Sequence, residues 1–368
     1  MAGWGESAMA LQIDNLLQGM VKFGASDLHV KVGSPPGYRI DGQIQPVKNL
    51  ERLAAEDTLE LAKQLLTHKQ FDELDERGDL DWAHGVPGLA RFRVSAMKQR
   101  GSIALFFRRI PVEPPDLDEL EAPPVCKDLA MRPRGLVLLA GPAACGKSTL
   151  AAAMISHRNA HVRGHILTVE DPVEFIHPDA LSFVNQREVG SDTPSFAAAL
   201  RHAFRQDPDV IFVGELRDVE TIALALTAAE TEHLVVATIQ TPGAAQTVER
   251  LIELFPADQQ QQVRVQLSDT LLGVIAQVLV PKVGGGLVPA REVLLGTDGV
   301  RACIRDGNTS QLRAIMQSGG PEGMLLLETS LGDLARQRVV ELEDAWAKAY
   351  EREALERATG RAPSDLVR

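Results

Sequence analysis

A nine-residue segment, GPAACGKST, constrains the fold of this chain more than any other feature. It runs from Gly141 to Thr149 and fits the pattern GxxxxGKS/T, which forms a loop between a buried strand and a helix. The strand-like run LVLLA precedes it and the helical run LAAAMI follows it, as the pattern requires. Because such a loop points backbone N–H groups at a bound anion, the segment predicts a phosphate site in an α/β fold.

The chemistry of this segment suits a nucleoside triphosphate with its metal ion. Backbone N–H groups can surround the β-phosphate, and Lys147 adds a positive charge near the β and γ oxygens. The hydroxyl group of Ser148 can bind Mg²⁺, so we expect ATP and Mg²⁺ as cofactors and Ser148 as a metal ligand. The predicted nucleotide-binding residues are Gly141, Pro142, Ala143, Ala144, Cys145, Gly146, Lys147, Ser148 and Thr149.

Two acidic clusters follow other strand-like runs in the same part of the chain. Glu170 and Asp171 come after HILTV, and Glu215 comes after VIFVG. Phosphoryl transfer to water needs one carboxylate to polarise the attacking water or accept its proton and another to hold the Mg²⁺ shell. Acids at strand ends are also common turn residues, so it is the neighbouring phosphate loop that favours a catalytic interpretation of both positions.

Hydrophobic periodicity divides the 368 residues into two predicted domains and a connector. Residues 1–110 mix helical spacing with short alternating strands, which is typical of a small α+β domain. Residues 111–125 contain five prolines among acidic residues, a composition typical of a stiff, exposed linker. Residues 126–368 alternate short apolar runs with helices and end in a helical tail, which predicts a parallel sheet buried on both faces.

Composition and charge exclude several classes of protein. An apolar fraction of 45% with 24% charged residues is typical of a packed globular protein and not of a disordered chain. The net charge of −12 without a basic patch predicts that the protein does not bind nucleic acid. The three cysteines lie far apart, which excludes a four-cysteine zinc ribbon and argues against a disulfide framework.

Two further features predict that the protein stays in the cytoplasm. The apolar stretch from Leu271 to Val280 is about half as long as the ~20 residues of a membrane helix, and Gln277 interrupts it. The first ten residues lack the positively charged flank and apolar core of an export signal. We therefore expect neither a membrane span nor secretion.

Six ordered segments give the chain a resemblance to a known family over nearly its whole length. The segments are ASDLHVKVGSPPGYRIDG, GPAACGKST, ILTVEDPVEFIH, NQREVG, DPDVIFVGELRD and LTAAETEHLVVATIQT. They resemble the type IV pilus retraction ATPases, of the PilT and PilU kind, within the secretion ATPase superfamily. The resemblance implies a RecA-like ATPase domain, a smaller PAS-like N-terminal domain and a homo-hexameric cytoplasmic motor. Such a motor hydrolyses ATP to power pilus retraction and twitching motility, docked on the inner-membrane platform of a pilus machine.

The resemblance also implies roles for individual residues. Glu170 resembles the catalytic glutamate of the family, and Glu215 resembles its Walker B glutamate, which lies next to Mg²⁺. His233 matches the first histidine of the family's His box. Arg93 and Arg108 resemble arginines that reach the γ-phosphate from the N-terminal domain of a neighbouring subunit, a task that suits a planar guanidinium. For either arginine the alternative is pairing with a nearby carboxylate on the sheet surface.

The chain departs from the family pattern at two places outside the phosphate loop. Gln240 replaces the second histidine of the His box, and it can donate to a γ-phosphate or orient a water but cannot become charged. The family's late AIRNLIR motif survives only as Val300 to Arg305. That motif is linked in the family to retraction and not to nucleotide turnover. Its erosion leaves open an accessory PilU-type subunit that depends on a second retraction ATPase.

The phosphate loop carries a further departure, Ala144-Cys145 in place of the family's Gly-Ser. If position 144 needs a positive φ, alanine there costs on the order of 1 to 2 kcal/mol, which weakens nucleotide binding without abolishing it. Cys145 lies beside a helix N-terminus and Lys147, and both features lower the pKa of a thiol. The alternative is that this cysteine is only a small residue tolerated in place of serine.

Three other functions remain as alternatives. An extension ATPase or a type II/IV secretion ATPase of the same superfamily typically adds a four-cysteine zinc site, which this chain lacks. A nucleotide-dependent scaffold without hydrolysis follows if Ala144 and Gln240 silence the site. A DNA translocase shares the RecA-like core, but the charge of −12 and the lack of interleaved aromatic and basic residues argue against it.

Overall fold

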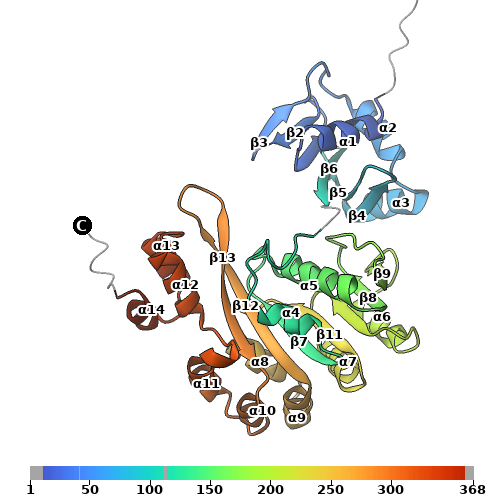
Figure 1. Ribbon diagram of the computed structural model, residues 1–368. Helices are drawn as coiled ribbons and strands as arrows, with labels where there is room; N and C mark the ends of the chain where they lie inside the picture. Colours follow the sequence, from blue (N-terminus) through green and yellow to red (C-terminus); the bar gives the residue numbers. More distant parts are fainter. Residues whose placement is uncertain (1–10, 41, 111–113, 361–368) are drawn as a thin grey trace, which may run out of the picture. The chain divides into compact units, whose positions relative to one another are not determined.

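A computed structural model describes residues 11–40, 42–110 and 114–360 of the chain (Figure 1). The chain forms two compact units that divide between Glu113 and Pro114, with Glu174–Ile176 grouped with the first unit. Of the predicted linker, residues 111–113 lie outside the described residues. In the described part of the chain, no helix has the length and apolar character needed to cross a membrane.

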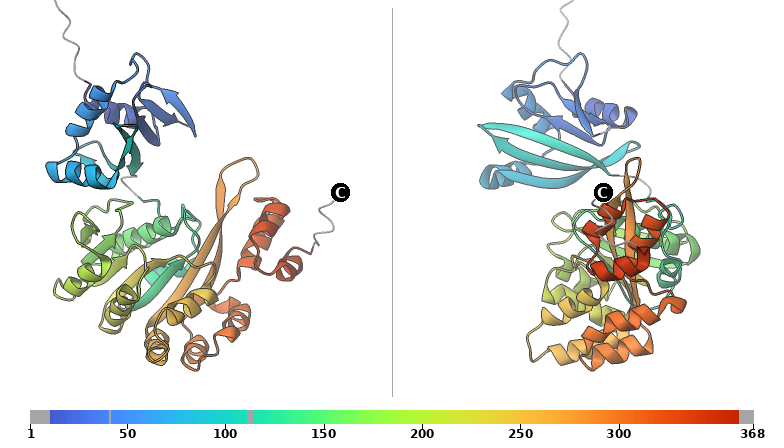
Figure 2. Two further views of the ribbon diagram at one scale, coloured as in Figure 1. Left: turned by 180° about the vertical axis from the view of Figure 1, so that it is seen from behind. Right: turned by 90° about the vertical axis from the view of Figure 1, so that its left-hand side faces the viewer.

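The first unit is an antiparallel sheet with helices packed against it (Figure 2). Within the described residues its six strands lie in the order β3-β2-β1-β6-β5-β4. The strands are β1 (Asp27–Val30), β2 (Gly37–Ile40), β3 (Gln43–Pro46), β4 (Asp79–Val86), β5 (Ala90–Gln99) and β6 (Ser102–Ile110), and the helices are α1 (Ile13–Lys22), α2 (Ala55–Lys63) and α3 (His68–Arg77).

Alternation along β5 separates a buried face of this sheet from an exposed one. Phe92 and Val94 are fully buried and share a hydrophobic cluster with Leu17 of α1 and Leu61 of α2. Arg93, which stands between them, is exposed. Successive side chains of a strand point to opposite faces, so this segment builds a core on one face and leaves polar groups on the other.

The second unit contains a mostly parallel sheet. Within the described residues its seven strands lie in the order β13-β12-β7-β11-β10-β8-β9, and only the β12–β13 pair is antiparallel. The strands are β7 (Gly135–Ala140), β8 (Gly164–Glu170), β9 (Ser182–Glu188), β10 (Val210–Val213), β11 (Leu234–Ile239), β12 (Leu271–Pro281) and β13 (Leu287–Leu295). The central strands β7, β10 and β11 are buried along their whole length and mostly apolar, as expected for a sheet covered on both faces.

Two helical layers cover this sheet. The helices α4 (Val125–Ala130) and α5 (Lys147–His161) share a hydrophobic cluster with one face of the sheet, and α6 to α11 share a cluster with the other. This arrangement confirms the predicted α/β fold. The later helices are α6 (Phe196–Ala203), α7 (Val219–Glu230), α8 (Ala244–Glu253), α9 (Gln260–Thr270), α10 (Asp298–Arg305), α11 (Leu312–Ser318), α12 (Leu327–Arg336), α13 (Leu342–Lys348) and α14 (Arg352–Thr359).

The described part of the predicted linker packs on the second unit. Leu117 is buried in the same hydrophobic cluster as α4 and α5. The guanidinium of Arg291 on β13 donates hydrogen bonds to the main-chain oxygens of Leu120 and Glu121 at 2.8 and 2.6 Å. The prolines stiffen this segment, but they do not prevent Leu117 from packing in the core, with Leu120 partly buried against the same cluster.

Candidate functional site

The predicted phosphate loop connects β7 to α5 in the second unit. Gly141 and Gly146 adopt positive φ values of 140° and 90°. A Cβ atom on Gly141 would lie 2.4 Å from the main-chain oxygen of Gln277, and one on Gly146 would lie 2.9 Å from the Nε2 atom of the same residue. Both positions therefore require glycine, for conformation and for space.

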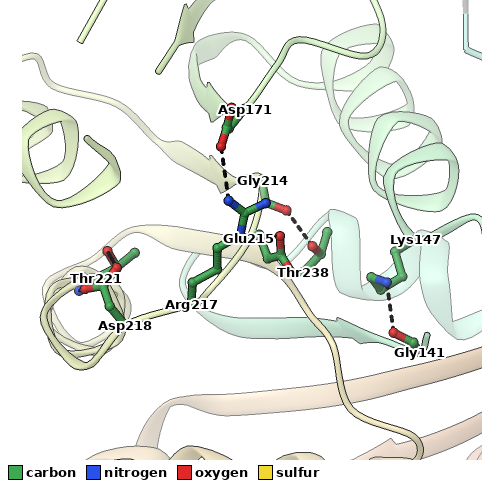
Figure 3. A network of polar contacts seen from close by, with 9 residues as sticks. All are labelled: Gly141, Lys147, Asp171, Gly214, Glu215, Arg217, Asp218, Thr221 and Thr238. Atoms are coloured by element: carbon green, nitrogen blue, oxygen red, sulfur yellow. Dashed lines mark hydrogen bonds and ion pairs between the residues drawn. The ribbon is translucent and has the colours of Figure 1, made fainter. Parts of the chain in front are cut away.

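Lys147, the first residue of α5, is buried within this loop. Its Nζ atom donates a hydrogen bond to the main-chain oxygen of Gly141 at 2.8 Å (Figure 3). It donates a second one to the main-chain oxygen of Pro142 at 2.7 Å. Ser148 and Thr149 follow it and are half-buried. The ammonium group therefore lies at a helix N-terminus, where the dipole and the backbone N–H groups already favour an anion.

The substituted pair Ala144-Cys145 meets one expectation and contradicts the other. Ala144 adopts a left-handed φ of 59°, so the strain expected at this position, on the order of 1 to 2 kcal/mol, applies. Cys145 is 3% exposed. Burial raises the pKa of its thiol even though Lys147 and backbone N–H groups act in the opposite direction. The prediction of a lowered thiol pKa is wrong, because desolvation of the thiolate outweighs the nearby positive charge.

Two buried polar residues of the β12–β13 hairpin support the loop. Gln277 on β12 donates from Nε2 to the main-chain oxygen of Cys145 at 2.7 Å. Its Oε1 atom accepts a hydrogen bond from Nε of Arg291 at 3.2 Å. Sequence reasoning missed this role. The signal was present, since Gln277 interrupts an apolar run and a buried amide needs hydrogen-bond partners.

Glu170 is the last residue of β8, at the edge formed by the carboxyl ends of β7, β8, β10 and β11, here called the phosphate edge. Its buried Oε1 atom accepts hydrogen bonds from Oγ1 of Thr168 at 2.7 Å and from Nε2 of Gln186 at 3.1 Å. A Cβ atom on Gly214 would lie 3.1 Å from Cα of Glu170. Gly214, the residue before Glu215, therefore packs directly against the backbone of Glu170. This contact brings the two predicted acids close together at the phosphate edge.

Glu215 lies in the loop between β10 and α7, beside Arg217 and Asp171 (Figure 3). Nε of Arg217 donates to Oε2 of Glu215 at 2.6 Å, and its Nη1 donates to Oδ2 of Asp171 at 3.1 Å. Burial lowers the pKa of the guanidinium, but its hydrogen bonds and the charges of both acids outweigh burial and raise the pKa above its usual value. Sequence reasoning did not single out Arg217, although an arginine two residues after an acid at a strand end was a visible signal.

The two ends of β11 carry the two predicted His-box residues. Ile239 pairs with Ala140, so Gln240 follows at the phosphate edge, where it is exposed. His233 precedes the strand at the opposite edge, and six residues of strand span about 20 Å. The Nδ1 atom of His233 lies 3.2 Å from the main-chain oxygen of Ala228. The structure therefore brings Gln240, and not His233, to the phosphate loop of the same chain.

The two predicted arginines lie in the first unit. Arg93 on β5 pairs in register with Arg108 on β6, so both share the face of the sheet opposite the core. Nε of Arg108 donates to Oδ1 of Asp27 at 2.8 Å, which is the carboxylate pairing considered as an alternative. Both arginines line a hollow of about 360 Å³ on this face. Its other lining residues are Asp27, His29, Arg39, Asp81, Ser95, Phe106 and Phe107.

The donor groups at the phosphate edge fit a magnesium nucleotide. Mg²⁺ prefers oxygen ligands and is commonly held by a hydroxyl, a carboxylate and substrate phosphates. Ser148 offers a hydroxyl group in the first turn of α5, and Glu215 offers a carboxylate in the loop after β10, at the same edge of the sheet. The loop between Gly141 and Lys147 supplies backbone N–H groups for the phosphates. Such a site can hold a nucleoside triphosphate and keep a second carboxylate, that of Glu170, for a water molecule.

Known proteins match this chain over most of its length. Residues 5–352 match the family described as type II/IV secretion system protein. The type IV pilus retraction ATPase PilT of Pseudomonas aeruginosa is 44% identical over 92% of this chain and 98% of its own. The type IV pilus ATPase PilU of the same organism is 40% identical over 92% of this chain and 89% of its own.

A solved structure extends this similarity to the fold. The crystal structure of the pilus retraction motor PilT with bound ADP matches with a TM-score of 0.89 at 44% identity. The match covers 94% of this chain and 99% of that one. This similarity confirms the predicted RecA-like ATPase fold.

Proposed function

Because the chain belongs to the type II/IV secretion system protein family, we propose that it is a homo-hexameric motor that powers retraction of a type IV pilus. It is an ATPase of the PilT and PilU kind. The observation that carries the proposal is the phosphate edge, where the loop that begins at Gly141 shares one side of the sheet with Glu170 and Glu215.

The two carboxylates at this edge have different roles in hydrolysis. Lys147 and the loop N–H groups would hold the β and γ phosphate oxygens, and Ser148 and Glu215 would hold Mg²⁺, whose charge would stabilise the developing negative charge. Glu170 orients the attacking water and accepts its proton. Its Oε1 atom is fixed by Thr168 and Gln186, so the carboxylate keeps one orientation from one turnover to the next.

Completion of the site needs a second subunit in this proposal. Arg93 and Arg108 of a neighbour reach the γ-phosphate, and Gln240 donates to it from the phosphate edge. Both arginines are exposed, and their guanidinium groups can bind phosphate oxygens at two points. His233 receives no nucleotide contact within its own chain, because it precedes β11 at the opposite edge.

The cellular setting follows from the same family. We place the protein in the cytoplasm, docked on the inner-membrane platform of a pilus machine, and expect no nucleic-acid partner. The net charge of −12 supports the last point, because an acidic surface repels phosphate backbones.

A second candidate is an accessory PilU-type subunit that needs a companion retraction ATPase. The similarity to PilU and the eroded motif from Val300 to Arg305 favour it. Arg301 within that motif donates to main-chain oxygens of Gly296 and Leu271, so it fastens α10 to the sheet. A strain without its own retraction ATPases distinguishes the two candidates. The motor restores twitching by itself, whereas the accessory subunit restores it only when the companion is also expressed.

Two substitutions test the assignment of the site. Lys147→Ala should remove measurable ATP hydrolysis and weaken nucleotide binding by about a hundredfold or more, because the loop loses its charge. Glu170→Gln should bind ATP normally but hydrolyse it about a hundred to a thousand times more slowly. Phosphate release and binding of a fluorescent ATP analogue measure the two effects. Lys31→Ala, an exposed change in the first unit, is the matched control. Hydrolysis at the wild-type rate in both site variants contradicts the proposal.

A further inference from the structure

Arg217 connects two acids that lie just after neighbouring strands, Asp171 after β8 and Glu215 after β10. Its Nε atom donates to Glu215 at 2.6 Å and its Nη1 atom donates to Asp171 at 3.1 Å. The two acids differ in exposure, since the side chain of Glu215 is 14% exposed and that of Asp171 is 41% exposed. The better-buried acid, Glu215, is the one that the proposed function assigns to Mg²⁺. The guanidinium of Arg217 therefore neutralises Glu215, which is also the proposed ligand of Mg²⁺.

The backbone on both sides of Arg217 is fixed. The N–H group of Gly214 donates to Val169 at 2.7 Å and that of Leu216 donates to Thr238 at 2.8 Å. On the other side, Asp218 caps α7 and accepts hydrogen bonds from the N–H and the hydroxyl of Thr221, each at 2.8 Å. Figure 3 shows the side chain of Arg217 extending from this loop toward Asp171. The backbone around Arg217 is therefore held in place, whereas its long side chain is 55% exposed and can change partners.

We propose that Arg217 is a positioning residue that neutralises Glu215 until Mg²⁺ arrives, and that Asp171 is the partner to which it then withdraws. The inference rests on the proposed function, because it requires Glu215 to face the metal ion. Glu215 exchanges one cation for another, so it is never left as a buried, unpaired charge. Asp171 keeps the released guanidinium close by, which makes the exchange reversible in each catalytic cycle.

The physical argument is a competition between cations. A half-exposed ion pair such as that of Arg217 with Asp171 is weak in water. A divalent ion interacts with the carboxylate of Glu215 more strongly than a single guanidinium does. The free energy needed for Mg²⁺ to displace Arg217 is therefore small. The same guanidinium must also reduce the affinity for Mg²⁺, both by occupying the carboxylate and by its own charge. Its removal and the removal of Asp171 should therefore act in opposite directions.

Binding of a fluorescent ADP analogue at increasing Mg²⁺ concentration tests this competition in the full chain. Arg217→Gln should lower the Mg²⁺ concentration for half-maximal binding by about three- to tenfold. Asp171→Asn should raise it by about two- to fivefold, because Arg217 then stays on Glu215. Arg217→Lys keeps the charge but cannot reach both acids in the same way, and its value should lie between those of the wild type and Arg217→Gln.

Two further variants separate the possible failures. Glu215→Gln should raise the required Mg²⁺ concentration more than Asp171→Asn does, and if it has no effect, the metal assignment in the proposed function fails. If Glu215→Gln weakens Mg²⁺ binding but Arg217→Gln and Asp171→Asn match the wild type or shift in the same direction, only the exchange is wrong. Arg201→Gln breaks an exposed ion pair with Glu220 elsewhere in this unit and should leave the Mg²⁺ dependence unchanged. If Arg217→Gln does not fold, Arg217→Lys and Asp171→Asn carry the test.

Discussion

The phosphate edge of the second unit and the exposed face of the first unit's sheet both carry predicted nucleotide contacts, but they are built differently. At the phosphate edge, Lys147 and Glu170 are buried and held by hydrogen bonds from their own unit. On the face of the first unit, Arg93 and Arg108 are exposed side chains on regular strands. The first region is organised before a ligand binds. In the proposed function, the second contributes only when a neighbouring subunit supplies the nucleotide.

Filling the phosphate loop should change stability and nucleotide binding most. Gly141→Ala places a Cβ atom 2.4 Å from the main-chain oxygen of Gln277 at a φ of 140°. We expect a loss of about 2 to 4 kcal/mol of stability and no measurable nucleotide binding. Urea denaturation and binding of a fluorescent nucleotide measure both.

The first unit supplies the matched control for this change. Gly88 also has a positive φ, of 74°, but a Cβ atom there meets nothing within 4 Å. Gly88→Ala should cost only about 1 kcal/mol and leave nucleotide binding intact. Equal effects of the two substitutions would show that the phosphate edge is not more tightly organised than the other region.

A smaller effect, confined to activity, is expected on the exposed face. Arg93→Ala should reduce ATP hydrolysis by about a hundredfold, because the γ-phosphate loses a cation in the transition state. Stability should change by less than about 0.5 kcal/mol, since the side chain is exposed. Steady-state hydrolysis and thermal denaturation are the two measurements.

Mixed assemblies sharpen this prediction. Arg93→Ala has an intact phosphate loop, and Lys147→Ala has an intact Arg93, so a mixture of the two inactive proteins should recover part of the wild-type rate. A mixture that stays inactive although the two proteins assemble together contradicts a contribution of Arg93 from a neighbouring subunit. Recovery with Lys147→Ala/Arg93→Ala in place of Lys147→Ala would contradict it as well.

The smallest expected effect relieves strain. Ala144 and Arg100 both adopt left-handed φ values, 59° in the phosphate loop and 51° in the turn between β5 and β6. Replacing either by glycine should stabilise the protein by about 0.5 to 1 kcal/mol, which is the relief of strain less the entropy that glycine adds to the unfolded chain. Only Ala144→Gly should also tighten nucleotide binding, by about two- to fivefold. Isothermal titration with ADP tells the two variants apart, and an equal change in affinity would refute the distinction.

Local sequence predicted the parts of the site that depend on neighbouring residues. The spacing of Gly141, Gly146 and Lys147 predicted a loop between a strand and a helix, and the loop has that place. The strain energy expected at Ala144 also depended on a single backbone angle, φ, and that angle is positive. These features could be predicted because a tight turn imposes its conformation on only a few consecutive residues.

Features that depend on distant parts of the chain could not be predicted in this way. Gln277 supports the loop across a separation of 132 residues, and the apolar run around it is compatible with a strand or a buried helix. Arg217 bonds to acids that follow two different strands, β8 and β10, and only the strand order makes them neighbours. The pKa of the Cys145 thiol is raised and not lowered as predicted, because burial outweighs the positive charge of Lys147. Local sequence patterns do not report burial.

The phosphate loop, with its lysine and hydroxyl residues, follows from the spacing of a few consecutive residues. Which side chains surround that loop depends on how the strands pack. The tertiary structure placed Gln240 and His233 at opposite ends of one strand, and it brought Gly214 against Glu170. The physical reason is that packing the sheet chooses which strand ends meet, and that choice depends on hydrophobic contacts between residues far apart in the chain.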